Sequence, residues 1–226
     1  RGAGQVAPNP LVGAVLVRDG EIVGEGWHAR FGDAHAEVVA LRAAGAAAAG
    51  ATMYVTLEPC NHHGKTPPCT DALIAAGIRR VVCATSDPNS IADGGAARLT
   101  AAGIDVSVGT CEQEARELNA AFIHAWTSDR PWVTLKLAIT LDAAIADNSL
   151  TTSRVTGPTA RQYAHRLRAG HDAVAVGMNT VRVDDPQLTV RENLILAGQE
   201  HQGTILKRLF GPRDAGLTGA ADKMIE

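Results

Sequence analysis

The stretch TLEPCNHHGKTPPC, residues 56–69, brings two cysteines, two histidines and a lysine close together in the chain. Upstream, DAHAEVVAL at residues 33–41 places His35 and Glu37 at the start of a predicted helix. One histidine and two cysteines supply the three protein ligands that a catalytic zinc ion takes when one position stays open for water. We therefore predict a zinc site whose ligands are His35, Cys60 and Cys69.

Glu37 stands two residues after the predicted histidine ligand, so it can face a water in the site without binding the metal. Such a carboxylate can carry a proton during hydrolysis. A His-x-Glu pair followed by Pro-Cys-x-x-Cys is the signature of zinc deaminases, but here eight residues separate Cys60 from Cys69. A closed structural site with His62 or His63 as the fourth ligand is the alternative, and it leaves Glu37 without a role.

Composition places the chain among ordinary globular proteins, with 226 residues, 46% of them hydrophobic and 20% charged. A net charge of −3 and an aromatic content of 4% argue against a nucleic-acid or membrane-surface partner. No apolar run reaches the roughly 18–20 residues that span a bilayer, and the opening residues lack the apolar core of a signal peptide. Four cysteines are too few for a disulfide framework in a chain of this length, so we expect a cytoplasmic protein.

Predicted strands and helices alternate along the first part of the chain. A β-hairpin is expected over residues 11–27, because two apolar runs flank Asp19-Gly20. Helices are expected over 35–50, 69–78, 94–104 and 111–127, and strands over 51–59, 79–87 and 105–109. This alternation predicts an α/β fold with helices on both faces of a sheet, and we assign it to a first domain, residues 1–127.

A second unit is expected over residues 128–226, beginning with a linker at 128–131. Its predicted elements are a strand at 132–139, a helix at 159–170, a strand at 172–178 and a polar loop at 181–188. A sheet with so few strands would have unpaired edges. Three explanations stay open: residues missing from the chain, a degenerate unit, or a partner that completes the sheet, which would make the protein a homo-oligomer.

Four segments carry a resemblance: APNPLVGAVLV (7–17), GEGWHARFGDAHAEVVALRAAG (24–45), TLEPCNHHGKTPPCTDALIAAGI (56–78) and SDPNSIADGGAARLTAAGI (86–104). In them the chain resembles the bifunctional riboflavin-biosynthesis deaminase/reductase family. The resemblance implies a zinc-deaminase α/β/α sandwich acting on 2,5-diamino-6-ribosylamino-4(3H)-pyrimidinone 5′-phosphate, from which ammonia is released. It also implies that Asn9, His28 and Lys65 contact this substrate. A lysine suits the phosphate, and an asparagine suits the pyrimidinone edge.

The segments RPWVTLKLAITLDAAIAD (130–147) and TGPTARQYAHRLRAGHDAVAVGMNTVRVDDPQLTVR (156–191) resemble the opening of the family's reductase domain. This implies a dihydrofolate-reductase-like fold and NADPH-dependent reduction of the ribosyl group to ribityl. The resemblance places nucleotide contacts at Ala138, Arg154, Thr180 and Asp184, and substrate contacts at Thr152, Arg168, Leu188 and Arg191. The chain departs from the family pattern at Ala143, where glycine is usual, and at Arg154, where tryptophan is common. The resemblance ends after Arg191, so the reductase-like domain is incomplete beyond that residue.

Two other functions stay open on the sequence. The chain could be a zinc-dependent deaminase of another nucleoside or base, although the acidic balance argues against a nucleic-acid substrate. It could also be a noncatalytic binding module with a structural zinc. Replacing Glu37 by glutamine separates the two classes, because only a catalytic site depends on a proton carrier.

Overall fold

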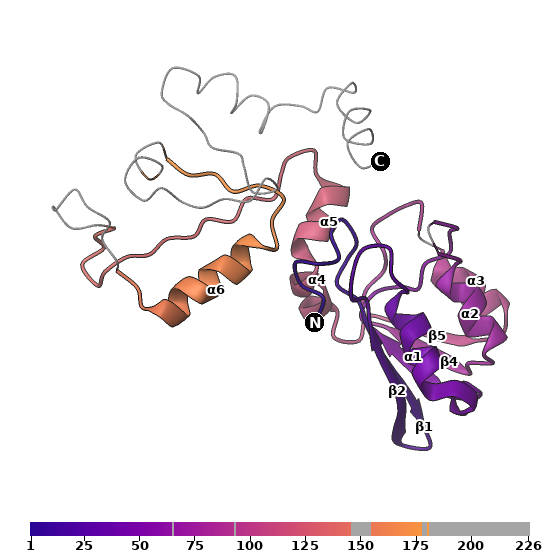
Figure 1. Ribbon diagram of the computed structural model, residues 1–226. Coiled ribbons are helices and arrows are strands. Elements are labelled where there is room, and N and C mark those ends of the chain that lie inside the picture. The colour runs from indigo at the N-terminus through magenta and orange to yellow at the C-terminus, as the bar shows by residue number, and fades with distance from the viewer. Residues whose placement is uncertain (65, 93, 146–154, 178–179, 181–226) are drawn as a thin grey trace. The chain divides into compact units, whose positions relative to one another are not determined.

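The computed structural model describes residues 1–64, 66–92, 94–145, 155–177 and 180 (Figure 1). The chain separates into two compact units, Arg1–Thr127 and Ser128–Glu226. Each unit has its own architecture, and the first contains the residues predicted to bind metal.

A five-stranded mixed sheet forms the centre of the first unit, in the order β2-β1-β3-β4-β5. The strands β1 (Gly13–Arg18) and β2 (Glu21–Trp27) form the antiparallel hairpin that the Asp19-Gly20 pair predicts. Both turn residues have positive φ, 52° and 83°, as the favoured two-residue hairpin turn requires. On the other side β1 pairs with β3 (Thr52–Val55), and the parallel strands β4 (Arg80–Cys83) and β5 (Asp105–Val108) follow.

Helix α1 (Ala36–Ala44) lies against the hairpin and is followed by a short 3₁₀ turn, η1 (Gly45–Ala48) (Figure 1). Two glycines of β2 permit this contact, since a Cβ on Gly24 would lie 2.5 Å from the Ala40 carbonyl oxygen and one on Gly26 2.3 Å from that of Ala36. Helix α2 (Cys69–Ala75) connects β3 to β4, and α3 (Gly95–Ala101) connects β4 to β5. These parallel connections are the helical crossovers expected between parallel strands.

Aliphatic side chains of the sheet and of α1, α2 and α3 form one core. Its fully buried large members are Leu16, Met53, Leu73, Val81 and Leu99. Each such side chain stabilises the fold by about 1.5–3 kcal/mol relative to an exposed one. The predicted α/β fold class is confirmed, and the core holds the site-bearing segments on a fixed sheet.

The prediction of a single helix over residues 111–127 is wrong in one respect. The structure has two helices, α4 (Glu112–Leu118) and α5 (Ala120–Thr127), separated at Asn119 with φ −109° and ψ 22°. The local pattern of the segment is helical throughout, but at Asn119 the backbone leaves the helical region, and its side chain hydrogen-bonds to the backbone of Leu11.

In the second unit, α6 (Pro158–Arg168) confirms the predicted helix, with proline in its first turn. The prediction of a strand over residues 132–139 is wrong. The strand predicted over 172–178 is also not formed in its described part, residues 172–177. A strand needs a hydrogen-bonding neighbour, and no described element of this unit supplies one. The loop expected at 181–188 lies outside the described residues. None of the described helices is long and apolar enough to cross a membrane.

Candidate metal centre and active site

The start of α1 and the two ends of the 60–69 segment provide the predicted metal ligands. His35 is the N-cap of α1, and Glu37 lies in the first turn of that helix. Cys60 lies in the segment that follows β3, directly after the buried Pro59. Cys69 is the first residue of α2. Because β3 and α2 both belong to the packed core, the ends of this segment are held in place.

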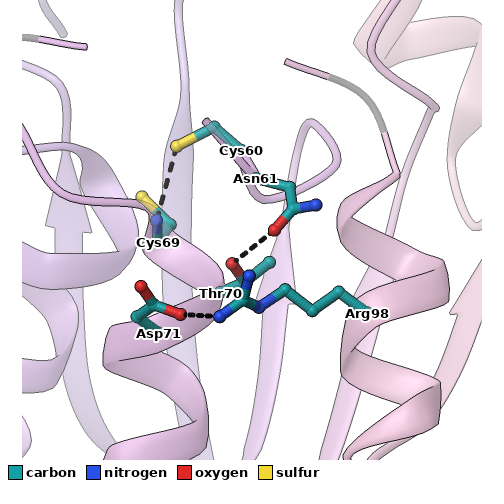
Figure 2. Close-up of polar contacts among 6 residues, drawn as sticks. All are labelled: Cys60, Asn61, Cys69, Thr70, Asp71 and Arg98. Atoms are coloured by element: carbon teal, nitrogen blue, oxygen red, sulfur yellow. Dashed lines mark hydrogen bonds and ion pairs between the residues drawn. The ribbon is translucent and has the colours of Figure 1, made fainter. Parts of the chain in front are cut away.

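The ligand atoms of His35, Cys60 and Cys69 all lie within 4.8 Å of one another. The Nδ1 atom of His35 is 3.2 Å from the Cys69 sulfur and 3.5 Å from the Cys60 sulfur. Tetrahedral zinc with ordinary bond lengths would separate such nitrogen and sulfur atoms by about 3.5 Å. Figure 2 shows the two cysteines facing each other, with the Cys69 backbone N–H donating to the Cys60 sulfur at 3.4 Å. The three residues therefore fit a zinc ion.

The proton affinities of these groups depend on one another. Hydrogen bonding from the Cys69 thiol lowers the pKa of Cys60, and His35 lowers it further, so Cys60 is the more acidic thiol of the pair. Hydrogen bonding to Cys60 in turn raises the pKa of the His35 imidazole. The other imidazole nitrogen, Nε2, lies 3.5 Å from the Thr66 hydroxyl. The ring is thus held with Nδ1 towards the sulfurs, which suits a cation bound there.

Glu37 is buried beside the ligands, with 3% of its surface exposed. Burial raises the pKa of its carboxyl group to about 7. The neighbouring Cys60 raises this pKa further, whereas His35 and Cys69 lower it. A carboxyl group with a pKa near neutrality can both accept and donate a proton, so the position predicted for a proton carrier is occupied by a suitable group.

Asn9 and His28 form a hydrogen-bonded pair near His35. The Asn9 Nδ2 atom is 3.1 Å from His28 Nε2, and His28 Nδ1 is 3.3 Å from the Ala34 carbonyl oxygen. Because a carbonyl only accepts, Nδ1 carries the hydrogen, and Nε2 can then accept from the Asn9 amide. Burial lowers the pKa of His28, which favours this neutral form. His28 is 3% exposed and orients Asn9, whose side-chain carbonyl oxygen accepts no hydrogen bond from the described residues.

Sequence reasoning missed the contacts that hold the Cys60 segment against α3. Glu58 is buried and accepts a hydrogen bond from the Ala96 N–H at 2.8 Å. A Cβ on Gly95 would lie 1.9 Å from the Pro59 carbonyl oxygen, so only glycine permits this approach. Towards α2, Asn61 accepts from the Thr70 hydroxyl at 3.2 Å (Figure 2). The Gly94-Gly95 pair was the one available sequence signal, because adjacent glycines mark close backbone approach.

The closed-site alternative finds no support in the part of the chain that the structure describes. Neither His62 nor His63 belongs to the ligand cluster there. The Nδ1 atom of His62 is buried without a hydrogen-bond partner among the described atoms. Asp87 lies within electrostatic range of His62 and Cys60, and burial raises the pKa of its carboxyl group to about 6.

The other predicted contacts are only partly described. Ala138 and Arg168 of the second unit are half-buried, Arg168 ends α6, and Thr180 is exposed. Outside the described residues lie Lys65, Thr152, Arg154, Asp184, Leu188 and Arg191.

Comparison with known proteins matches two separate regions of the chain to two different families. Residues 2–85 match the family described as the cytidine and deoxycytidylate deaminase zinc-binding region. Residues 131–198 match the family described as the RibD C-terminal domain. The first match contains the whole ligand cluster.

Relatives that match most of the chain are riboflavin biosynthesis proteins. The RibD protein of Aquifex aeolicus is 55% identical over 189 residues, which are 83% of this chain and 53% of the relative. That of Escherichia coli is 53% identical over 84% of this chain and 52% of the relative. The chain thus spans about half the length of these curated relatives.

Two solved structures agree with this grouping. The RibD structure from Acinetobacter baumannii matches with a TM-score of 0.77 and 42% identity, over 92% of this chain and 63% of that one. A Thermotoga maritima diaminohydroxyphosphoribosylaminopyrimidine deaminase/5-amino-6-(5-phosphoribosylamino)uracil reductase matches with a TM-score of 0.79 and 43% identity, over 93% of this chain and 62% of that one. By its two matched domains and these relatives, the chain belongs to the riboflavin-biosynthesis deaminase/reductase family.

Proposed function

We propose that the first unit catalyses the zinc-dependent hydrolytic deamination of 2,5-diamino-6-ribosylamino-4(3H)-pyrimidinone 5′-phosphate in riboflavin biosynthesis. The observation that carries the proposal is the set of three ligands, His35, Cys60 and Cys69, with buried Glu37 beside it. Three protein ligands leave a position for water, and the named activity of the Thermotoga relative supplies the substrate.

A zinc ion in this site would lower the pKa of water to about 7 and so supply hydroxide at neutral pH. Glu37 accepts the proton that the water loses and passes it to the ring amine. The new carbon–oxygen bond then replaces the carbon–nitrogen bond, and ammonia leaves. The burial that raises the pKa of Glu37 to about 7 makes this carboxyl group suited to both transfers.

Substrate recognition is assigned to Asn9, His28 and Lys65. The Asn9 carbonyl oxygen accepts from an N–H of the pyrimidinone edge, while His28 holds the Asn9 amide at 3.1 Å. This makes His28 an orienting residue more than a direct contact, because both of its ring nitrogens are occupied within the protein. Lys65 supplies a cation for the substrate phosphate.

The test is ammonia release from the pyrimidine substrate by the full chain, with and without a chelator. Glu37→Gln should lower turnover by about 10²–10⁴-fold, the usual contribution of a general acid–base, while zinc content stays complete. Turnover of cytidine or deoxycytidylate in place of this substrate would favour another deaminase. If the wild type contains its full complement of zinc but turns over no pyrimidine, a structural zinc would be favoured.

We further propose that residues 128–226 form the opening part of an NADPH-dependent reductase, joined to a deaminase domain that ends at residue 127. The match of residues 131–198 to the RibD C-terminal domain supports this. In this proposal Ala138, Arg154, Thr180 and Asp184 contact the nucleotide, and Thr152, Arg168, Leu188 and Arg191 contact the sugar phosphate. Fluorescence titration with NADPH tests it, and undetectable binding at millimolar cofactor would contradict it.

The partners of this proposal are small molecules, and neither nucleic acid nor membrane is required. The cysteines that the structure describes are free, which fits the cytoplasmic location that we expect. A homo-oligomer stays a prediction, and sedimentation of the full chain as a monomer would contradict it.

A further inference from the structure

Asn119 is a buried asparagine, 3% exposed, at the break between α4 and α5. Its Oδ1 atom accepts the Leu11 N–H at 2.8 Å, and its Nδ2 atom donates to the Leu11 carbonyl oxygen at 3.0 Å. One side-chain amide therefore satisfies both backbone groups of a residue 108 positions away, as a neighbouring strand would. Leu11 is half-buried, and leaving both of its backbone groups unpaired would cost stability, so this pairing helps to fix where Leu11 lies.

Leu11 is in turn close to the substrate-contact region. Only Pro10 separates it from Asn9, and proline restricts its own backbone and that of the preceding residue, Asn9. On the other side, the Val12 carbonyl oxygen accepts the His28 N–H at 3.0 Å. The segment is thus held at Leu11 by Asn119 and at Val12 by His28. The Asn9 side chain projects from this segment to His28 Nε2 at 3.1 Å.

We propose that Asn119 is a positioning residue that acts through Leu11 to set the place of the Asn9 amide, and so the place of the substrate ring. The inference rests on the proposed deaminase function. The backbone supports a dedicated role for the side chain, since the Asn119 N–H and carbonyl already bond within the two helices, to Ala115 and Ile123. The amide is therefore not needed to end α4 or to begin α5.

The test compares Asn119→Leu, which keeps the branched shape and removes both hydrogen-bonding atoms, with the wild type. KM should rise about tenfold or more with a smaller change in kcat, because the variant displaces a binding group and leaves the metal ligands in place. Zinc content should be unchanged. Asn119→Asp keeps the acceptor for the Leu11 N–H and loses the donor. Its KM should therefore lie between that of the wild type and that of Asn119→Leu. This second variant serves where Asn119→Leu does not fold.

A double-mutant cycle shows whether Asn119 acts through Asn9. The pair Asn9→Ala with Asn119→Leu should be no worse than Asn9→Ala alone, because the group being positioned is already gone. If the effects of Asn9→Ala and Asn119→Leu on KM instead multiply in the double variant, the proposal is overturned. Ile123→Ala is the matched control in α5, since it removes a buried side chain and keeps the Asn119 amide that bonds to Leu11, and it should lower Tm while KM stays unchanged. An equal rise of KM in this control would also overturn the proposal.

A spectroscopic readout separates this inference from the proposed function. The ¹⁵N shift of His28 Nε2 reports its hydrogen bond with the Asn9 amide, with or without substrate turnover. Absence of ammonia release by the wild type would defeat the proposed function alone. An unchanged His28 Nε2 shift in Asn119→Leu would defeat the positioning role alone, and a shift matching that of Asn9→Ala would support it.

Discussion

The β1 strand of the first unit and residues 132–139 of the second have similar apolar patterns and opposite outcomes. Leu16 in β1 is 0% exposed, whereas Leu137 is 61% exposed. The β1 strand is hydrogen-bonded on both sides, to β2 and to β3. Residues 132–139 form no strand in the described structure. An apolar, β-branched run becomes a strand where neighbouring strands accept its hydrogen bonds, so the pattern is necessary and not sufficient.

The same difference extends to function. In the first unit, chain segments far apart in sequence meet at the metal ligands, because the sheet holds their ends. In the second unit, no described residue is buried, and α6 is its one described helix. The chemistry that the geometry supports therefore lies in the first unit, and the following predictions test that contrast from its largest expected effect to its smallest.

Removing a sulfur ligand should abolish the chemistry of the first unit. Cys60→Ser and Cys69→Ser are each expected to lower bound zinc and to reduce ammonia release by at least about a hundredfold, because the three-ligand site is lost. Metal analysis and an ammonia assay check this. Cys111→Ser, at an exposed thiol, is the control and should keep both. A full zinc complement in both ligand variants would contradict the ligand assignment.

Truncating one leucine in each unit should sharpen the contrast in packing. Leu73→Ala removes a fully buried side chain of α2 and should lower the free energy of unfolding by about 2–5 kcal/mol. Leu137→Ala removes an exposed one and should change it by no more than about 0.5 kcal/mol. Urea unfolding followed by circular dichroism measures both. Comparable losses would show that the second unit also has a packed core in solution.

Adding one methyl group to a glycine in each unit tests how closely the backbone is packed. Gly95→Ala places a Cβ 1.9 Å from the Pro59 carbonyl oxygen, so the start of α3 or the Cys60 segment must move. We expect a loss of about 1–3 kcal/mol in stability and about 10–100-fold weaker zinc binding. Gly157→Ala, before α6, meets no atom within 4 Å and is the control. Equal zinc affinity in Gly95→Ala and wild type would contradict the role of α3.

The smallest effect concerns pH and the buried carboxyl group of Asp87. Burial raises its pKa from 3.8 to about 6, so the folded protein holds this proton more tightly than the unfolded chain does. The associated stability is therefore present below pH 3.8 and is lost as the pH rises to about 6. Asp87→Asn keeps the acceptor for the Asn89 N–H and should remove this loss of stability with rising pH. Solvent screening limits the loss to about 1 kcal/mol. Identical pH profiles of unfolding for the two proteins would contradict it.

Much of the first unit could be predicted from local sequence because its signals are local. The Asp19-Gly20 pair favours a two-residue hairpin turn in any context. Likewise, the residue types of the metal cluster suggest zinc chemistry before any geometry is known. The pairing of Asn119 with Leu11 at the break between α4 and α5 could not be predicted in this way, because the two residues are 108 positions apart. Glu58 was missed for the same reason, since its partner, Ala96, belongs to another crossover.

The sequence by itself determined which residues can act as ligands and proton carrier, where the hairpin turns, and which family the chain resembles. Each of these depends on residue identity and short spacing. Only the tertiary structure decided that His35, Cys60 and Cys69 lie within bonding range of one ion and that burial raises the pKa of Glu37 to about 7. It also decided that His28 pairs with Asn9 and that Asn119 pairs with Leu11. These properties arise from distance and exclusion of water between segments far apart in the chain, and no local pattern encodes them.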